Sequence, residues 1–294
     1  MIPRKISKAV IPVAGLGTRM LPVTKELPKE MLPVLSKPLI QHIVEEAIEA
    51  GISEIIFITR NGKEAIKNHF DNNYELDSYL NKKGKKDILK KLPNYIFKKI
   101  HFFSVLQKKP LGLGHAILTA EHIIQNESFA VLLPDEFLIS KNKNSDLKRM
   151  LSNYNNFNQN QILVEKVPKK NISQYGVIKL RANKLTINNP QNIIDIVEKP
   201  LLKDAPSNKR VVGRYIFSSS IFKYLKKTKP GKDNEIQLTD SIKEKIIKEK
   251  NSFQATLSNS EIYDCGSLKG FVGANIASGL RDQELKKYIT EILK

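Results

Sequence analysis

The feature that most constrains the fold is the alternation of apolar, β-branched segments with segments of helical periodicity. In the first half of the chain, strand-like runs occur at 8–13, 54–59, 100–106 and 129–133. Helical spacing of apolar residues occurs at 39–48, 64–70 and 115–124, and Gly51 follows the first of these as a helix stop. Nearly continuous apolar strands that alternate with helices are typical of a mostly parallel sheet covered on both faces. The sequence therefore predicts a Rossmann-like α/β fold with a mostly parallel, mixed sheet.

The second half of the chain is richer in β-structure. Its predicted strands are 162–167, 175–180, 193–197, 211–217 and 252–257, and its predicted helices lie near 219–226 and 236–248. A polar, lysine-rich stretch at 71–99 interrupts the alternation of strands and helices and predicts a helical insertion. The C-terminal segment, 267–294, is predicted to be helical. The sequence shows neither a repeat of fixed period nor a flexible linker, so we expect one compact domain over 1–294.

Charge and cysteine content narrow the functional classes. The 49 Lys and Arg residues exceed the 30 Asp and Glu residues, which gives a net charge of +19. The basic residues are scattered, tryptophan is absent, and no RNA-binding or zinc-finger pattern occurs, so we expect no nucleic-acid partner. A diffuse positive field would still help to collect anionic substrates.

Three further features bear on location. Cys265 is the single cysteine, which excludes an intramolecular disulfide and suits a reducing cytoplasm. No uncharged apolar run reaches the ~20 residues of a membrane helix, so no membrane partner is expected. The short apolar stretch that follows the basic N-terminus is predicted to be the first strand and not a signal peptide.

A glycine-rich turn, VAGLGTR, follows the first strand. Gly15 and Gly17 would allow a sharp bend that turns backbone N–H groups toward a ligand. Neither common phosphate motif fits, because a dinucleotide fingerprint needs glycine where Met20 stands and the Gly-Lys-Ser/Thr of a P-loop is absent. Arg19 and Lys29 lie in the proline-studded loop that follows. From these residues alone, both a nucleotide site and a purely structural turn with solvated cations stay open.

The segment AGLGTRMLPVTKELPKEMLPV resembles the signature of bacterial sugar-nucleotide pyrophosphorylases, specifically the UTP–glucose-1-phosphate uridylyltransferases. The similarity continues in the order and spacing of the family along nearly the whole chain. The matching pieces are Gln107 with GLGHA (112–116), LLPDE (132–136), QYGVI (174–178), VEKP (197–200), APSN (205–208), VGRYIF (212–217), DNEIQLTD (233–240) and YDCG (263–266).

Two aspartates are candidate metal ligands. Asp135 follows the predicted strand 129–133, and Asp264 follows the predicted strand 252–257 and a short turn. Mg²⁺ prefers one or two carboxylates completed by phosphate oxygens and water, although Asp also favours caps and turns. The resemblance implies that Asp135 and Asp264 hold a Mg²⁺ that bridges the nucleotide and sugar phosphates. Glu136 stands where many relatives have Asp or Val, and we assign it no ligand role.

The resemblance also implies a sugar site. Glu198 and Lys199 precede Pro200 at the end of a predicted strand, where they are either a solvated pair or ligands of a sugar and its phosphate. By resemblance, Glu198 contacts glucose and Lys199 its phosphate. Gly176 and Gly213 match segments at which a flat sugar face approaches the backbone, although a strand bend would also account for them.

The nucleotide side follows in the same way. Ala14, Gly15, Gln107 and Gly112 match positions that contact uracil, and Gly17 belongs to the same glycine-rich turn. A glutamine amide can donate and accept together, which suits the carbonyl–imide edge of this base.

The implied reaction converts UTP and glucose 1-phosphate to UDP-glucose and pyrophosphate. The sugar phosphate is already anionic near neutral pH, since its second pKa is ~6, so no general base is needed. Arg19 and Lys29 would hold the triphosphate and Lys199 the attacking phosphate. Relatives are commonly homodimers or homotetramers. A sister enzyme that uses dTTP or another sugar stays open.

Other polar residues have weaker signals. The five histidines show no metal-ligand spacing, and we expect His115 to be structural. Cys265 is predicted to pack and not to act as a nucleophile. The segment 234–240 is expected near the sugar, without individual roles.

Overall fold

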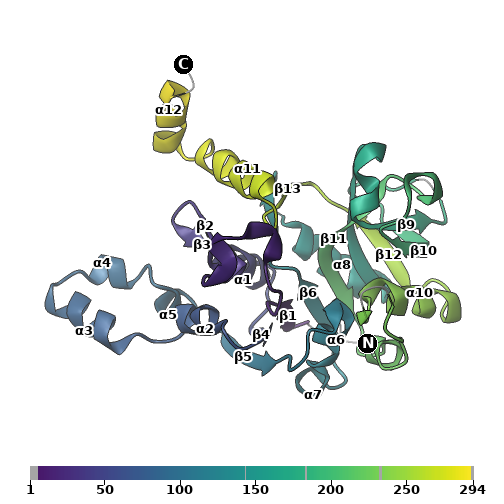
Figure 1. Cartoon of the computed structure of the whole chain (residues 1–294), viewed down its shortest axis with the longest axis horizontal. Helices are drawn as coiled ribbons and strands as arrows, with labels where there is room; N and C mark the ends of the chain where they lie inside the picture. Colours follow the sequence, from purple (N-terminus) through teal and green to yellow (C-terminus); the bar gives the residue numbers. More distant parts are fainter. Residues whose placement is uncertain (1–5, 143, 183, 232–233, 293–294) are drawn as a thin grey trace.

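A nine-stranded mixed sheet runs through the centre of the computed structural model (Figure 1). The structure describes residues 6–142, 144–182, 184–231 and 234–292, and within them the strand order is β5-β4-β1-β6-β11-β8-β12-β10-β9. The strands of this sheet are β1 (Lys8–Pro12), β4 (Glu54–Thr59), β5 (His101–Leu106), β6 (Phe129–Leu132), β8 (Asn160–Lys166), β9 (Gly176–Leu180), β10 (Gln191–Glu198), β11 (Lys209–Phe217) and β12 (Phe253–Leu257).

One half of the sheet is wholly parallel. β5, β4, β1 and β6 all run the same way, with Val10 of β1 opposite Ile56 on one side and Val131 on the other. These three side chains are fully buried, as expected for strands covered on both faces. The strands predicted in the first half of the chain are confirmed.

The other half is mixed. β11 runs antiparallel to β6 and β8, β12 is parallel to β8, and β10 is antiparallel to both β12 and β9. The predicted α/β class and Rossmann-like mixed sheet are confirmed, with the parallel pairing concentrated in the N-terminal half.

Helices cover both faces of the sheet. Side chains of α1 and α8 belong to one apolar core, and those of α6, α9 and α10 belong to the core on the other face. The α-helices are α1 (Leu39–Glu49), α2 (Glu64–Phe70), α3 (Tyr74–Lys82), α4 (Lys86–Leu89), α5 (Pro93–Ile96), α6 (Gly112–Leu118), α7 (Glu121–Ile124), α8 (Asp146–Phe157), α9 (Ile221–Leu225), α10 (Leu238–Lys248), α11 (Leu268–Gly279) and α12 (Gln283–Ile292). The single helix predicted at 115–124 is wrong, because the helix begins at Gly112 and breaks after Leu118.

The helical insertion predicted at 71–99 contains α3, α4 and α5. It projects beyond the β5 edge of the sheet (Figure 1). Phe97 anchors it, because its ring lies 6.1 Å from that of Phe70 and 6.4 Å from that of Phe102. At the other end of the chain, α12 extends away from the sheet and has no buried residue (Figure 1). None of the described helices is long and apolar enough to cross a membrane.

A small antiparallel ribbon was not predicted. β7 (Glu136–Ser140) pairs with β13 (Ser260–Asp264), and Asp264 lies opposite Glu136. The expectation of only a short turn before Asp264 is therefore wrong. A second ribbon joins β2 (Pro33–Val34) and β3 (Lys37–Pro38). The proline-studded loop forms three 3₁₀ helices, η1 (Thr18–Met20), η2 (Val23–Lys25) and η3 (Lys29–Met31). Two more lie later in the chain, η4 (Lys169–Gln174) and η5 (Leu202–Asp204).

Candidate active site

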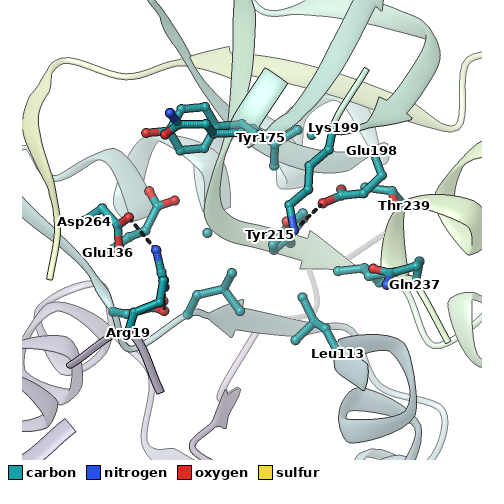
Figure 2. Close-up of a pocket in the computed structure, with 17 residues that line it drawn as sticks. Arg19, Leu113, Glu136, Tyr175, Glu198, Lys199, Tyr215, Gln237, Thr239 and Asp264 are labelled. Carbon is teal, nitrogen blue, oxygen red and sulfur yellow. Dashed lines mark hydrogen bonds and ion pairs between the residues drawn. The ribbon is translucent and has the colours of Figure 1, made fainter. Parts of the chain in front are cut away.

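Two adjoining cavities open at the carboxyl ends of β1 and β6, where α/β sheets place their ligands. The larger, of about 410 Å³, contains the predicted sugar ligands Glu198 and Lys199 and is called the sugar-side cavity. The smaller, of about 330 Å³, contains the predicted nucleotide ligands Gly15 and Gln107 and is called the nucleotide-side cavity. Leu113, Leu133 and Asp135 line both. The two cavities therefore meet at Asp135. The sugar-side cavity is shown in Figure 2.

The two predicted metal-ligand aspartates lie together at this junction. The backbone N–H of Cys265 donates to the carbonyl of Asp135 at 2.7 Å, which ties the chain beside Asp264 directly to the turn that carries Asp135. Arg19 contacts both carboxylates, at 3.0 Å from Asp264 and 3.7 Å from Asp135. In Figure 2, Arg19 and Asp264 stand on one side of the cavity. Residues 129 positions apart in the chain are thus brought to one point by the β7–β13 ribbon.

Asp135 is held ionised by its neighbours. Burial alone would raise its pKa, but the Lys29 ammonium, 2.7 Å away, and the Arg19 guanidinium outweigh burial and lower the pKa. Lys29 is itself largely enclosed, and the charges of Asp135 and Glu30 raise its pKa in spite of that desolvation. The junction therefore carries a charged acid between two cations.

The glycine-rich turn forms one wall of the nucleotide-side cavity, together with Ala14. A Cβ atom added at Gly15 would have only Lys29 Cε within 4 Å, at 3.9 Å, so the space above it is open to a ligand. Gly17 lines neither cavity. Its φ of +74° and the bond from Thr24 Oγ1 to its carbonyl at 2.8 Å shape the turn.

Gln107 and Gly112 also line the nucleotide-side cavity. The amide nitrogen of Gln107 lies 3.2 Å from the Gly112 carbonyl and 3.0 Å from His115 Nδ1. Both contacts use the nitrogen, so the amide oxygen is left to accept a bond from a ligand. His115 thus holds Gln107 in place.

Glu198 and Lys199 line the sugar-side cavity across from Arg19 and Asp264 (Figure 2). Glu198 ends β10, and burial raises its pKa, which the Lys199 charge offsets only in part. The Lys199 side chain is 64% exposed and its Nζ lies 3.8 Å from Glu198 Oε1. Gly176 lines the same cavity, and a Cβ there would lie 3.2 Å from Glu198 Oε2.

Gly213 also lines the sugar-side cavity, but the space beside it is filled by protein. A Cβ at Gly213 would lie 2.5 Å from Leu133 Cβ. The β11–β8 register shifts between Val211 and Tyr215, so a strand irregularity lies at this glycine. The missing side chain therefore lets β11 pack closely against Leu133, beside the Asp135 turn.

The whole chain has close relatives. A nucleotidyl transferase family model matches residues 8–278. The UTP–glucose-1-phosphate uridylyltransferase of Haemophilus influenzae is 44% identical over 290 residues, which cover 98% of each chain. A UTP-bound UDP-glucose pyrophosphorylase from Acinetobacter baumannii superimposes with a TM-score of 0.90 at 39% identity, covering 98% of this chain and 99% of that one. A UDP-glucose pyrophosphorylase complexed with UDP-glucose gives 0.85 at 41% identity, covering 95% and 100%.

The chain belongs to the UTP–glucose-1-phosphate uridylyltransferases, within the nucleotidyl transferase family. The family resemblance seen in the sequence is confirmed. This uridylyltransferase chain covers its relatives almost from end to end, so no cavity described above falls outside the shared fold.

The donor set of this uridylyltransferase suits Mg²⁺. Among the described residues, no cluster of three or more His, Cys, Asp or Glu side chains is arranged to hold a metal, and Asp135 and Asp264 converge as a pair. Two carboxylates with open positions for phosphate oxygens and water are what Mg²⁺ prefers. The residues present therefore fit the ion.

Several cavity residues were not assigned from the sequence. Tyr175 lines the sugar-side cavity, and the Arg210 guanidinium lies 4.4 Å from the centre of its ring. Arg210 also pairs with Glu136 at 3.1 Å and with Glu165 at 2.8 Å. No spacing in the sequence connects these four residues, because they come from three separate strands and a loop.

The segment 234–240 does reach the sugar-side cavity, where Gln237, Leu238 and Thr239 line it. Asp233, the first residue of the matching motif, lies outside the described residues. Cys265 is 1% exposed, and burial together with Asp264 raises its pKa to about 12. A thiol with so high a pKa is a poor nucleophile, which agrees with a packing role.

Proposed function

We propose that the protein transfers the uridylyl group of UTP to glucose 1-phosphate, giving UDP-glucose and pyrophosphate. The observation that carries this proposal is the meeting of two cavities at Asp135, one built from the glycine-rich turn and Gln107 and the other from Glu198 and Lys199. Relatives named for this activity, at 39–44% identity over nearly the full chain, support the same assignment.

The reaction depends on aligning the two substrates and offsetting their negative charge more than on proton transfer. A phosphate oxygen of glucose 1-phosphate forms a bond to the α-phosphorus of UTP, and the bond from that phosphorus to the bridging oxygen breaks, so pyrophosphate leaves with the electron pair. The attacking monoester has a second pKa of ~6, so it is largely dianionic at neutral pH and no residue has to remove a proton. The protein holds two polyanions in line and offsets their repulsion.

Arg19 and Lys29 face the triphosphate in this proposal. Both lie within 4 Å of Asp135 at the junction of the cavities, where charge moves toward the leaving oxygens. Asp135 and Asp264 would hold Mg²⁺, which when bound offsets phosphate charge and templates the two substrates.

Lys199 and Glu198 face the sugar phosphate. Lys199 supplies a point charge on a flexible stem, which suits a phosphate that must approach along one line. The Glu198 carboxylate accepts bonds from glucose hydroxyls, and Gly176 leaves room beside it.

Gln107 reads the base by offering its amide oxygen to the N3–H of uracil. Thymine carries the same group and cytosine does not, so this contact favours uracil or thymine over cytosine and does not by itself separate UTP from dTTP. The alternative of a sister thymidylyltransferase is therefore an outcome of the test.

The test is pyrophosphate release from each pairing of UTP, dTTP, CTP, ATP and GTP with glucose 1-phosphate and its epimers, with and without Mg²⁺. We expect UTP with glucose 1-phosphate and Mg²⁺ to give the highest kcat/KM, and omission of the sugar phosphate to abolish release. A higher kcat/KM with dTTP would assign the sister activity, and no release from any pairing would refute both.

We also propose a homodimer or homotetramer in the cytoplasm. Leu268, Val272 and Ile276 stand exposed at four-residue spacing on α11, which is a surface suited to another copy. Cys265 is a free thiol, as reducing compartments favour. Light scattering that finds a monomer at micromolar concentration would contradict the oligomer.

A further inference from the structure

The largest fully buried side chain of the described protein is a charged one, Arg214 of β11. A buried guanidinium is costly unless it is paired and fully hydrogen-bonded. Arg214 lies next to Gly213, at the point where β11 packs against Leu133. Ordinary packing therefore does not explain why an arginine occupies this buried position.

The hydrogen-bond partners of Arg214 explain its position. Its Nε and Nη2 atoms donate to the two carboxylate oxygens of Glu46 at 2.9 and 2.7 Å, as a bidentate pair. Its Nη1 donates to the carbonyls of Leu133 and Gly213, each at 3.1 Å, and Nη2 donates to the carbonyl of Glu136 at 2.9 Å. The guanidinium thus bonds the backbone on both sides of Asp135.

These bonds fall where the sheet ends. β6 stops at Leu132 and β7 begins at Glu136, so residues 133–135 turn between two different sheets. Arg214 fixes the start and the end of this turn, while the N–H of Cys265, the residue that follows β13, fixes the Asp135 carbonyl. Glu46 reaches in from α1 and sets the plane of the guanidinium.

We propose that Arg214, oriented by Glu46, is a positioning residue that holds the 133–136 turn so that the Asp135 carboxylate stays beside Asp264. The proposal rests on the proposed function, in which these two carboxylates act at the reacting phosphates. A displacement of about 1 Å at a reacting centre costs on the order of 10²-fold in rate, so a brace on this turn acts on turnover more than on substrate affinity.

Arg214→Lys keeps the charge and removes the planar fork, and Glu46→Gln keeps the volume and removes the charge that orients it. We expect each variant to lower kcat ~10–100-fold while the KM values for UTP and glucose 1-phosphate change less than ~3-fold. Kinetics are measured well below the melting temperature of each variant, and circular dichroism checks that it is folded.

Arg149→Lys is the matched control. Arg149 also pairs with a carboxylate, Asp146, at 2.6 Å and donates to two backbone carbonyls, those of Ile187 and Leu257, but it lies outside both cavities. We expect it to lose melting temperature and to keep its kcat within ~2-fold. If Arg214→Lys does not fold, Glu46→Gln decides the question.

A kcat within ~2-fold of wild type for folded Glu46→Gln, or an equal loss in Arg149→Lys, would overturn the positioning role. A crystal structure of Glu46→Gln provides a readout without turnover, and an unmoved Asp135 turn there would overturn the role as well. Failure of the wild-type protein to release pyrophosphate would instead refute the proposed function, so the two failures are distinguishable.

Discussion

Asp135 and Glu198, the carboxylates on the two sides of the site, are built in opposite ways. Burial opposes ionisation of both, but at Asp135 the cations Lys29 and Arg19 outweigh burial and lower the pKa. At Glu198 burial prevails over the charge of Lys199 and the pKa is raised. Distance and the number of cations both contribute, since Lys29 Nζ lies 2.7 Å from Asp135 and Arg19 adds a second cation, whereas Lys199 Nζ lies 3.8 Å from Glu198.

The contrast separates a fixed part of the site from an adaptable one. Lys29 is 15% exposed and Lys199 is 64% exposed, so the first is immobilised by its surroundings and the second is free to follow a ligand. A charge that is already in position stabilises the transition state most, whereas a mobile charge can adjust to a substrate as it binds. Substitutions on the two sides should therefore affect different kinetic constants.

Asp135→Asn should give the largest effect. The amide keeps the shape but loses the charge that pairs with Lys29 and would hold a metal, so we expect kcat to fall about 10²–10³-fold, as for loss of one prearranged electrostatic group. Steady-state kinetics measure the loss. Asp195→Asn is the control, since Asp195 pairs with Lys243 at 3.0 Å and lines neither cavity. Near-wild-type turnover of Asp135→Asn would remove it from the reaction.

Lys199→Ala should have the second largest effect on the kinetic constants. Loss of an exposed point charge at the sugar phosphate is expected to raise KM for glucose 1-phosphate about 10-fold and to lower kcat, within the 1.5–3 kcal/mol range of a hydrogen bond to a charged group. KM for UTP should stay unchanged. Lys203→Ala, an exposed lysine of η5 that lines neither cavity, is the control. A change confined to the UTP constants would reverse the assignment of the two sides.

Glu198→Gln tests the raised pKa. A carboxyl whose pKa is raised takes up its proton at a higher pH than usual, and the protonated form resembles the uncharged glutamine. We therefore expect Glu198→Gln to raise KM for glucose 1-phosphate at alkaline pH, and the ratio to wild type to shrink at acid pH, starting at a higher pH than for an ordinary glutamate. Titration of the substrate cancels in this ratio. A ratio that is constant with pH would show that ionisation of Glu198 does not matter.

Cys265→Ala should have the smallest effect on activity. The thiol is buried, its pKa is about 12, and the bond from residue 265 to Asp135 uses the backbone N–H, which alanine retains. We expect kcat within 2-fold of wild type and a loss of about 1 kcal/mol in the free energy of unfolding from the small cavity. A loss of turnover comparable with that of Asp135→Asn would mean that the thiol takes part in the chemistry.

Much of the fold follows from local pattern. Apolar runs located the strands of the parallel half, and Asp135 was expected at the end of one of them, where the structure has it after β6. The apolar pattern is strong in β1, β4 and β6 because both faces of these three strands are buried. The edge strand β5 is mostly exposed.

Non-local contacts explain what could not be predicted. Every residue of β13 is only partly buried, so its pattern is weak, and its pairing with β7 joins residues more than 100 positions apart. Arg214 stands in the apolar run of β11, where a charged side chain suggests an exposed position, yet its carboxylate partner comes from α1. The role of Gly213 depends on Leu133, which is also distant in sequence.

The shared wall of the two cavities, formed by Leu113, Leu133 and Asp135, also bears on how the product leaves. UDP-glucose would span both compartments at once, whereas each substrate fills one. A molecule that occupies two joined sites loses its translational freedom only once, so it is held more tightly than its separate halves. UDP-glucose should therefore compete with UTP and with glucose 1-phosphate alike. Accumulated UDP-glucose would then inhibit the enzyme that makes it.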